Sequence, residues 1–201
     1  MPVTGTPIST TATIESWRID TLPYLHSCHE AIVDQALRRG LREFCRDTDV
    51  WREQLSFTTV ADQTVYDLNA EIGVSYDARV RRVLKVKVGD FEFDQTLYEV
   101  QDDLDLEFES SLTADLTMLV DVSLVPTEQW NTVSTELITD WADAPKAWAL
   151  MHLKAMPRTP WSDEAWQYWQ QEYRGHVARA KADWLEGHEL GNASVTIRPF
   201  V

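Results

Sequence analysis

The hydrophobic period of this chain changes twice along its 201 residues. A segment at about 28–46 carries apolar residues at helical spacing. Its apolar stripe consists of Val33, Leu37, Leu41 and Phe44. Roughly eighty residues then show two-residue alternation, which is clearest at 116–124, and helical spacing returns after Trp141. This order predicts an α+β fold: a helical bundle with long N-terminal and C-terminal helices, an inserted small antiparallel β barrel or sandwich, and extended termini.

The same pattern divides the chain into four kinds of segment. Residues 1–20 are expected to form an extended N-terminal arm, and residues 188–201 an extended C-terminal tail. The helical bundle is expected at 21–54 and 140–187, with the β module at 55–139. Because the β module is inserted between two helical stretches, the chain must cross from one part to the other twice.

Three local signals refine this prediction. Ser27 is expected to cap the first long helix, with Glu30 completing a capping box. Gly40 lies within that helix, where it costs about 1 kcal/mol relative to alanine, so it suits a place where another backbone approaches closely. Gly89-Asp90 separates two apolar runs and predicts a hairpin turn.

The formal net charge is −15, from 33 acidic and 18 basic residues. Phosphate binding needs lysine and arginine, so this balance disfavours nucleic-acid binding by the body of the chain. No stretch approaches the roughly 18 apolar residues of a membrane span, and the polar start lacks the pattern of a signal peptide. Cys28 and Cys45 lie too far apart on one helix to pair, which fits a reducing cytoplasm.

No sequence string typical of a catalytic or cofactor site occurs, whether G-x-S-x-G, H-E-x-x-H, a P-loop or G-x-G-x-x-G. We therefore expect neither enzyme activity nor a cofactor. His26, Cys28 and His29 lie close together, but a zinc site needs four ligands at suitable spacing. Helix capping and packing is the better interpretation of these three residues.

Acidic and apolar residues alternate in two expected strands. The acidic residues are Asp90, Glu92 and Asp94 in the first strand and Asp103, Asp105, Glu107 and Glu109 in the second. Alternate residues of a strand share a face, so each strand would have one wholly acidic face. Two interpretations remain open: a solvated edge protected against aggregation, or a surface past which a polyanion slides without binding.

Two further sets of residues are expected to bind partners. The first long helix has an arginine-rich face and the last has an aromatic stripe, and two such different surfaces are typical of head-to-tail subunit contacts. The nine tryptophans also favour large buried contacts. The candidates for the subunit interface are Arg38, Arg39, Arg42, Trp166, Trp169 and Tyr173. The tail has apolar side chains in a polar, extended terminus, which suits docking by strand addition. Its candidates are Val195, Ile197, Arg198 and Phe200.

Seven short segments occur in an order that resembles a known family. They are Leu22–Glu30, Ala36–Cys45, Val50–Arg52, Gln63–Leu68, Val80–Val83, Leu124–Thr127 and Met156–Ser162. This succession, over roughly residues 20–185, resembles the head-to-tail adaptor (neck or connector) proteins of tailed bacteriophages, in particular those of the tail tubular protein A kind.

The resemblance implies a structural virion protein without catalytic residues. Members of the family form a ring, usually of twelve subunits, between the portal protein and the tail or nozzle protein. For this chain it implies a homo-oligomer in the virion neck, assembled in the host cytoplasm, through which DNA passes without specific binding during genome ejection. The tail at 188–201 would then bind the portal protein, and the acidic strands would face the DNA channel.

Two alternatives remain. One is a tail-completion or baseplate structural protein, and the other is a cellular module that binds peptide or carbohydrate. Exposed tryptophans lining a concave pocket would favour the cellular module. A buried histidine or carboxylate cluster in a large cleft would favour an enzyme.

Overall fold

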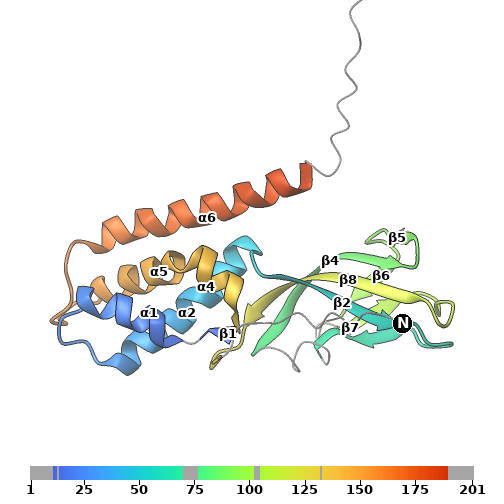
Figure 1. Ribbon diagram of the computed structural model, residues 1–201, viewed down its shortest axis with the longest axis horizontal. Helices are drawn as coiled ribbons and strands as arrows, with labels where there is room; N and C mark the ends of the chain where they lie inside the picture. Colours follow the sequence, from blue (N-terminus) through green and yellow to red (C-terminus); the bar gives the residue numbers. More distant parts are fainter. Residues whose placement is uncertain (1–10, 13, 70–76, 102–104, 132, 190–201) are drawn as a thin grey trace, which may run out of the picture.

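The structure is a computed structural model, and it describes residues 11–12, 14–69, 77–101, 105–131 and 133–189. Figure 1 shows an elongated molecule in which the helices gather at one end and most of the strands at the other. Within these residues, every helix is too short or too polar to cross a lipid bilayer.

Five α-helices and one short 3-10 helix form the helical part of the described chain. They are α1 (Ile14–Thr21), η1 (Leu22–Tyr24), α2 (Glu30–Thr48), α4 (Thr135–Trp141), α5 (Asp143–Lys154) and α6 (Trp166–Glu189). Pro23 lies in the short 3-10 helix, and Ser27 adopts a left-handed conformation with a φ of 64°, so the chain turns before α2 begins. Pro145 lies in the first turn of α5, where its missing N–H is not needed.

The apolar stripe predicted for the first long helix is confirmed, since Val33, Leu37, Leu41 and Phe44 are all buried in α2. The predicted capping box is wrong. His29 is the N-cap instead, and its Nδ1 accepts a hydrogen bond from the backbone N–H of Ala31 at 3.2 Å. The reason is the left-handed turn at Ser27, which leaves that side chain outside the helix start.

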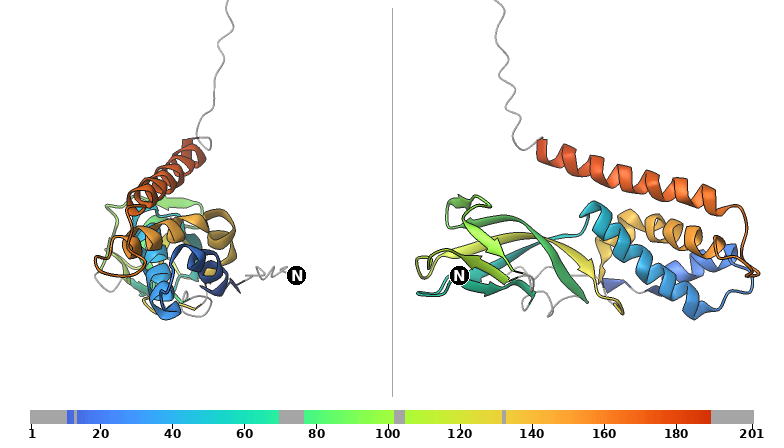
Figure 2. Two further views of the ribbon diagram at one scale, coloured as in Figure 1. Left: turned by 90° about the vertical axis from the view of Figure 1, so that its left-hand side faces the viewer. Right: turned by 180° about the vertical axis from the view of Figure 1, so that it is seen from behind.

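The expected close approach at Gly40 is confirmed. A Cβ placed there would lie 2.8 Å from the carbonyl oxygen of Pro145, which is rigid backbone of α5. Glycine therefore lets α2 and α5 pack closely. Figure 2 shows α6 lying along this pair, with its C-terminal end reaching past them toward the β module.

The β module consists of two antiparallel sheets. Its four-stranded sheet has the order β2 (Arg52–Thr58), β8 (Thr117–Pro126), β4 (Ala78–Val88) and β5 (Phe91–Phe93). Its three-stranded sheet has the order β3 (Val65–Asp67), β7 (Asp105–Phe108) and β6 (Tyr98–Val100). A separate short pair joins β1 (Thr11–Ala12) to β9 (Val133–Ser134). The hairpin turn predicted at Gly89-Asp90 is confirmed, with Gly89 at a φ of 57° between β4 and β5.

Aromatic rings join the two sheets. The ring of Phe108 on β7 lies 5.4 Å from that of Phe93 on β5 and 6.1 Å from that of Tyr66 on β3. Tyr66 in turn lies 6.2 Å from Phe57 on β2. Such edge-to-face contacts stabilise the packing beyond the area that the rings bury. The apolar faces of the strands therefore meet in one core, and their polar faces point outward.

The predicted fold class is wrong in its main feature. The fold is mixed α and β with two antiparallel sheets and five helices in the described residues, not a bundle of long N-terminal and C-terminal helices. Proline and left-handed residues break some of the helical stretches, and α1 and α4 span only 8 and 7 residues. Nor is the stretch 1–20 wholly an extended arm, because it contains β1 and most of α1. A small sheet-rich part is present, as expected.

Candidate interaction site

A groove of about 1110 Å³ crosses the outer face of the β module and is lined by β2, β4, β5, β6 and β8. Arg52, Arg81 and Arg82 lie at the end of the groove that is nearest to α2. A smaller cavity of about 180 Å³ shares Arg52 and Arg82 with it and is completed by residues of α2 and by Lys181 of α6. The groove therefore begins where the helical part meets the β module.

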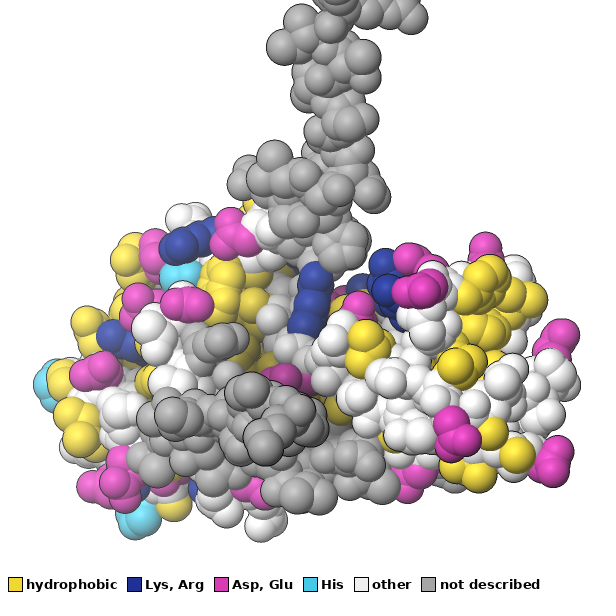
Figure 3. All heavy atoms as spheres, turned by 45° about the vertical axis from the view of Figure 1, so that its right-hand side comes forward, with side chains coloured by type: hydrophobic (Ala, Val, Ile, Leu, Met, Phe, Trp, Pro, Cys, Tyr) yellow, Lys and Arg dark blue, Asp and Glu magenta, His cyan; other side chains and the backbone are white. Residues whose placement is uncertain are grey.

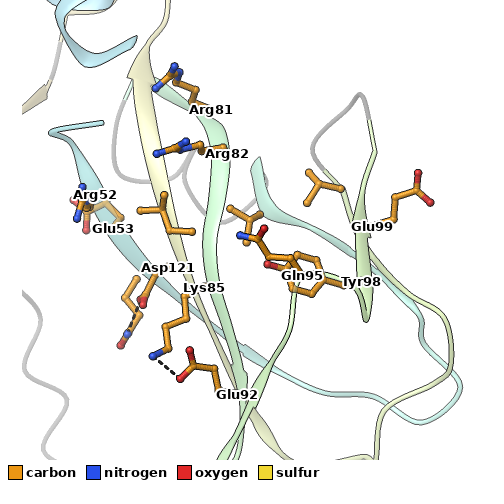
Figure 4. A pocket seen from close by; sticks show the side chains of 14 residues that line it. Arg52, Glu53, Arg81, Arg82, Lys85, Glu92, Gln95, Tyr98, Glu99 and Asp121 are labelled. Carbon is orange, nitrogen blue, oxygen red and sulfur yellow. Dashed lines mark hydrogen bonds and ion pairs between the residues drawn. The ribbon is translucent and has the colours of Figure 1, made fainter. Parts of the chain in front are cut away.

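Irregular pairing of β4 brings two arginines to the same place. The register of β4 against β8 shifts between Val80 and Arg82, and again between Val83 and Lys85. A bulge of this kind interrupts the alternation of side chains, so the neighbours Arg81 and Arg82 point the same way. Figure 4 shows both side chains extending from β4 across β8 toward β2.

Asp49 is the carboxylate that holds these arginines. It follows α2 in a left-handed conformation, and its backbone N–H donates to the carbonyl oxygen of Cys45 at 3.0 Å. Its largely buried side chain forms ion pairs with both Arg81 and Arg82. The Nε of Arg52 donates to the carbonyl oxygen of Asp49 at 3.0 Å. The end of α2 is thus tied to the first strand and to the bulged strand of the β module.

The positive charges of this cluster are crowded. Burial lowers the pKa of Arg52, with Asp49 opposing that effect and Arg82 adding to it. On β8, Ser123 pairs in register with Arg52 on one side and Arg82 on the other. Its side chain is 0% exposed, and its hydroxyl has no hydrogen-bond partner among the described residues. We name Asp49, Arg52, Arg81, Arg82 and Ser123 the junction cluster.

The far part of the groove is mainly acidic, because Glu92, Glu99 and Asp121 line it beside a single described base, Lys85. Lys85 Nζ lies 2.6 Å from an oxygen of Glu92, and the side-chain amide of Gln54 donates to Asp121 at 2.8 Å. Neither histidine, cysteine nor tryptophan lines the groove in the part of the chain that the structure describes. Within the same residues, no group of three histidine, cysteine, aspartate or glutamate side chains is placed to hold a metal ion.

The acidic residues of the second predicted strand lie on or beside β7, the central strand of the three-stranded sheet. Asp105 and Glu107 are half-buried on that strand, Glu109 is exposed just after it, and Asp103 lies outside the described residues. Two further acids continue this surface, because Asp67 of β3 pairs with Asp105, and Glu99 of β6 pairs with Glu107. We name Asp67, Glu99, Asp105 and Glu107 the acidic face.

Like charges directly opposite one another destabilise an antiparallel pair. The acidic face holds two such pairs in adjacent positions, while the other side of β7 carries the buried Leu106 and Phe108. The predicted alternation of acidic and apolar residues is therefore confirmed for Asp105–Phe108, the described strand.

The acidic residues of the first predicted strand lie around β5, at the free end of the β module. Asp90 and Asp94 are exposed at the two ends of this strand, and Glu92 is paired with Lys85 across the sheet. β5 and β7 belong to different sheets, but Glu92 and Glu99 of the acidic face line the same groove.

The three arginines predicted for the subunit interface contact their own chain. Arg38 donates to the carbonyl oxygen of Trp130 at 3.2 Å, and Arg42 forms an ion pair with Glu128 at 3.1 Å. Arg39 lies over the ring of Trp148 at 5.6 Å. Two of them thereby fix the loop after β8 against α2.

The aromatic residues predicted for the same interface also pack within the chain. Trp169 contacts the ring of Tyr24 at 5.3 Å, and Trp166 is half-buried at the start of α6. Tyr173 is buried, and its hydroxyl donates to Asp47 of α2 at 2.8 Å. Burial and this carboxylate raise the pKa of Tyr173 well above its usual range.

The tail residues Val195, Ile197, Arg198 and Phe200 lie outside the described residues. The junction cluster was not predicted from the sequence, although one signal for it exists. Arg81-Arg82 places two charged residues side by side in a strand that otherwise alternates, which is the pattern of a bulge. In comparisons with known proteins, no family model matches this chain and no curated protein matches its sequence.

Proposed function

We propose that this protein is a structural subunit of a tailed-bacteriophage neck, a head-to-tail adaptor that forms a ring between the portal protein and the tail. The observation that carries this proposal beyond the sequence resemblance is the acidic face. A chain that only needed solubility could scatter its charges, whereas this one sets like charges opposite each other at Asp67–Asp105 and Glu99–Glu107. Such pairing costs folding stability and so suits a surface that must repel a polyanion.

The use of the chemically reactive side chains also favours a structural role. Cys45 is fully buried, and burial raises the pKa of its thiol, which keeps it protonated. The ring of His152 lies against that of Trp148, tilted by 41° with ring centres 3.8 Å apart, and burial and Arg39 lower its pKa. These groups pack the helical part and do not line the groove.

The alternative of a cellular carbohydrate-binding module is less well supported. Such modules stack sugar rings on exposed aromatic side chains, and the lining of this groove is mainly charged with Tyr98 as its aromatic residue. A tail-completion or baseplate protein would share the acidic face. Contact with the portal protein, which we assign to residues 188–201, distinguishes the adaptor from it.

The decisive experiment is electron microscopy of the purified protein, alone and mixed with the portal protein of the same genome. The proposal predicts a closed ring stacked on the portal ring, and loss of the complex when residues 188–201 are deleted. A chain that stays monomeric in the presence of the portal protein would overturn it. Binding to a purified tail tube in place of the portal would favour the tail-completion alternative.

A further inference from the structure

The proposed ring needs two complementary surfaces on each subunit, and those predicted from the sequence contact their own chain. Arg38, Arg42 and Tyr173 have partners within the protomer. Head-to-tail contacts join two different surfaces of the same protein, so each copy must present one of each kind.

One surface lies at the free end of the β module. Phe91 is 59% exposed on the edge strand β5, and Leu97 is 40% exposed nearby. The carboxylates of Asp90 and Asp94 flank Phe91 in the sequence, at the two ends of its strand. We name Asp90, Phe91, Asp94 and Leu97 the β tip. In Figure 3, hydrophobic side chains gather toward this end of the molecule with acidic ones at their margin.

The β tip is held in a defined shape. The hairpin turn at Gly89 precedes it, and Gly89 N–H donates to the carbonyl oxygen of Thr117 at 2.9 Å. A second turn closes with a hydrogen bond of 2.9 Å from Leu97 N–H to the carbonyl oxygen of Asp94. Phe91 contacts the ring of Phe93, which packs into the aromatic core. A preformed surface binds with a smaller loss of conformational entropy.

The other surface is the groove at the junction cluster. One carboxylate, that of Asp49, serves both Arg81 and Arg82, and the side chain of Arg82 is still 52% exposed. The buried hydroxyl of Ser123 lies between Arg52 and Arg82 in the register of the sheet. Ser123 is 0% exposed and does not line the groove, so a docking carboxylate would meet the exposed guanidinium of Arg82 instead.

We propose that the β tip of one copy docks in the junction groove of a second copy, where an aspartate of the tip binds Arg82 and Phe91 covers the groove. This inference rests on the proposed ring. The charges are complementary, because the tip presents Asp90 and Asp94 while the near end of the groove carries three arginines beside two acids, Asp49 and Glu53. The tip and the junction cluster lie at different ends of the β module, so the contact joins two different surfaces and repeats head to tail, as the proposed ring requires.

Charge reversal on each side provides the test. Variant one is Asp90→Lys/Asp94→Lys, and variant two is Arg82→Glu. Each should assemble poorly alone, with at least a tenfold higher concentration needed for rings, because like charges meet at every contact. An equimolar mixture should assemble, since the lysine tip fits the glutamate groove and the remaining contacts are unchanged. Arg174→Glu, an exposed change on α6, is the matched control and should assemble normally.

Assembly is measured by native mass spectrometry and analytical ultracentrifugation, with the portal protein added if the chain alone is monomeric. Because Arg82→Glu also removes an ion pair to Asp49, circular dichroism must show that it folds, and Phe91→Ser gives a second test that leaves the junction cluster intact. Should wild-type rings form and all three variants assemble like wild type, the tip–groove contact is wrong and the proposed function stands. A wild-type chain that forms no ring with the portal protein refutes both.

Discussion

At the scale of single residues, Gly40 shows how a local cost supports a tertiary contact. Glycine destabilises a helix interior, yet here any Cβ would lie 2.8 Å from the backbone of Pro145. Gly175 in α6 offers a comparison within the same protein, because a Cβ added there would meet nothing within 4 Å. Alanine substitutions at the two glycines therefore separate the effect of helix propensity on stability from the effect of packing.

We predict opposite effects for the same substitution at these two positions. Gly40→Ala should lower the free energy of unfolding by about 2 kcal/mol, because α2 and α5 must move apart. Gly175→Ala should raise it by about 0.5–1 kcal/mol through helix propensity alone. Urea denaturation of both variants checks this. A stabilised Gly40→Ala would mean that α2 and α5 do not pack closely at this point.

Single residues also show what sequence patterns leave open. The close approach at Gly40 and the hairpin turn at Gly89 were predictable, because a glycine in a helix interior or between two apolar runs usually meets a specific structural requirement. The cap of α2 was not, since Ser27 and His29 both suit a helix start and the backbone of the preceding turn decides between them. The junction cluster was missed for a related reason: Asp49 and Arg82 are 33 positions apart and meet only through the fold.

At the scale of elements, strands were predicted better than the helical assembly. Alternating side chains reveal a strand directly, as in β8, where Met118, Val120 and Val122 are all buried. A helical stripe shows that one face is covered but not by what. The stripe of α6 that contains Trp169 and Tyr173 was predicted to meet another subunit, and it packs on α2 and α5 of its own chain.

The hydrogen bond between α6 and α2 gives a prediction at this scale. Tyr173→Phe removes the hydroxyl that donates to Asp47 but keeps the buried ring. We expect a loss of about 1 kcal/mol in the free energy of unfolding, because Asp47 can regain water when its partner is removed. Thermal or urea denaturation measures the loss.

Tyr168→Phe is the matched control for this change, since Tyr168 is exposed on the same helix. Its effect should be within about 0.5 kcal/mol, as is usual for surface substitutions. Equal losses for the two variants would show that α6 is not tied to α2 through Tyr173.

At the scale of the whole molecule, the order of helices and strands along the chain was predictable, whereas the overall fold class was not. Which strands pair depends on contacts between distant residues, so the sheet order β2-β8-β4-β5 cannot be derived from local alternation. The residues that form the acidic face were predicted only in part. Asp105 and Glu107 were expected to form an acidic surface, but the sheet adds Asp67 and Glu99 from neighbouring strands.

The acidic face gives the last prediction. Glu99→Lys together with Asp105→Lys changes one member of each like-charged pair, so two repulsive pairs become attractive. The free energy of unfolding should rise by about 0.4–2 kcal/mol. The variant should also gain binding to double-stranded DNA at low salt, which weakens steeply as salt increases because each phosphate contact releases counterions.

Asp140→Lys together with Glu164→Lys is the matched control, because it makes the same change in net charge at exposed positions of the helical part. Fluorescence anisotropy with labelled DNA between 20 and 200 mM salt, on the order of the range in which such contacts weaken, compares the two variants. In assembled virions, the acidic-face variant should slow genome ejection and the control should not. If both variants bind DNA equally and ejection is unchanged, the acidic face does not line the channel, and protection of a solvated sheet against aggregation explains it better.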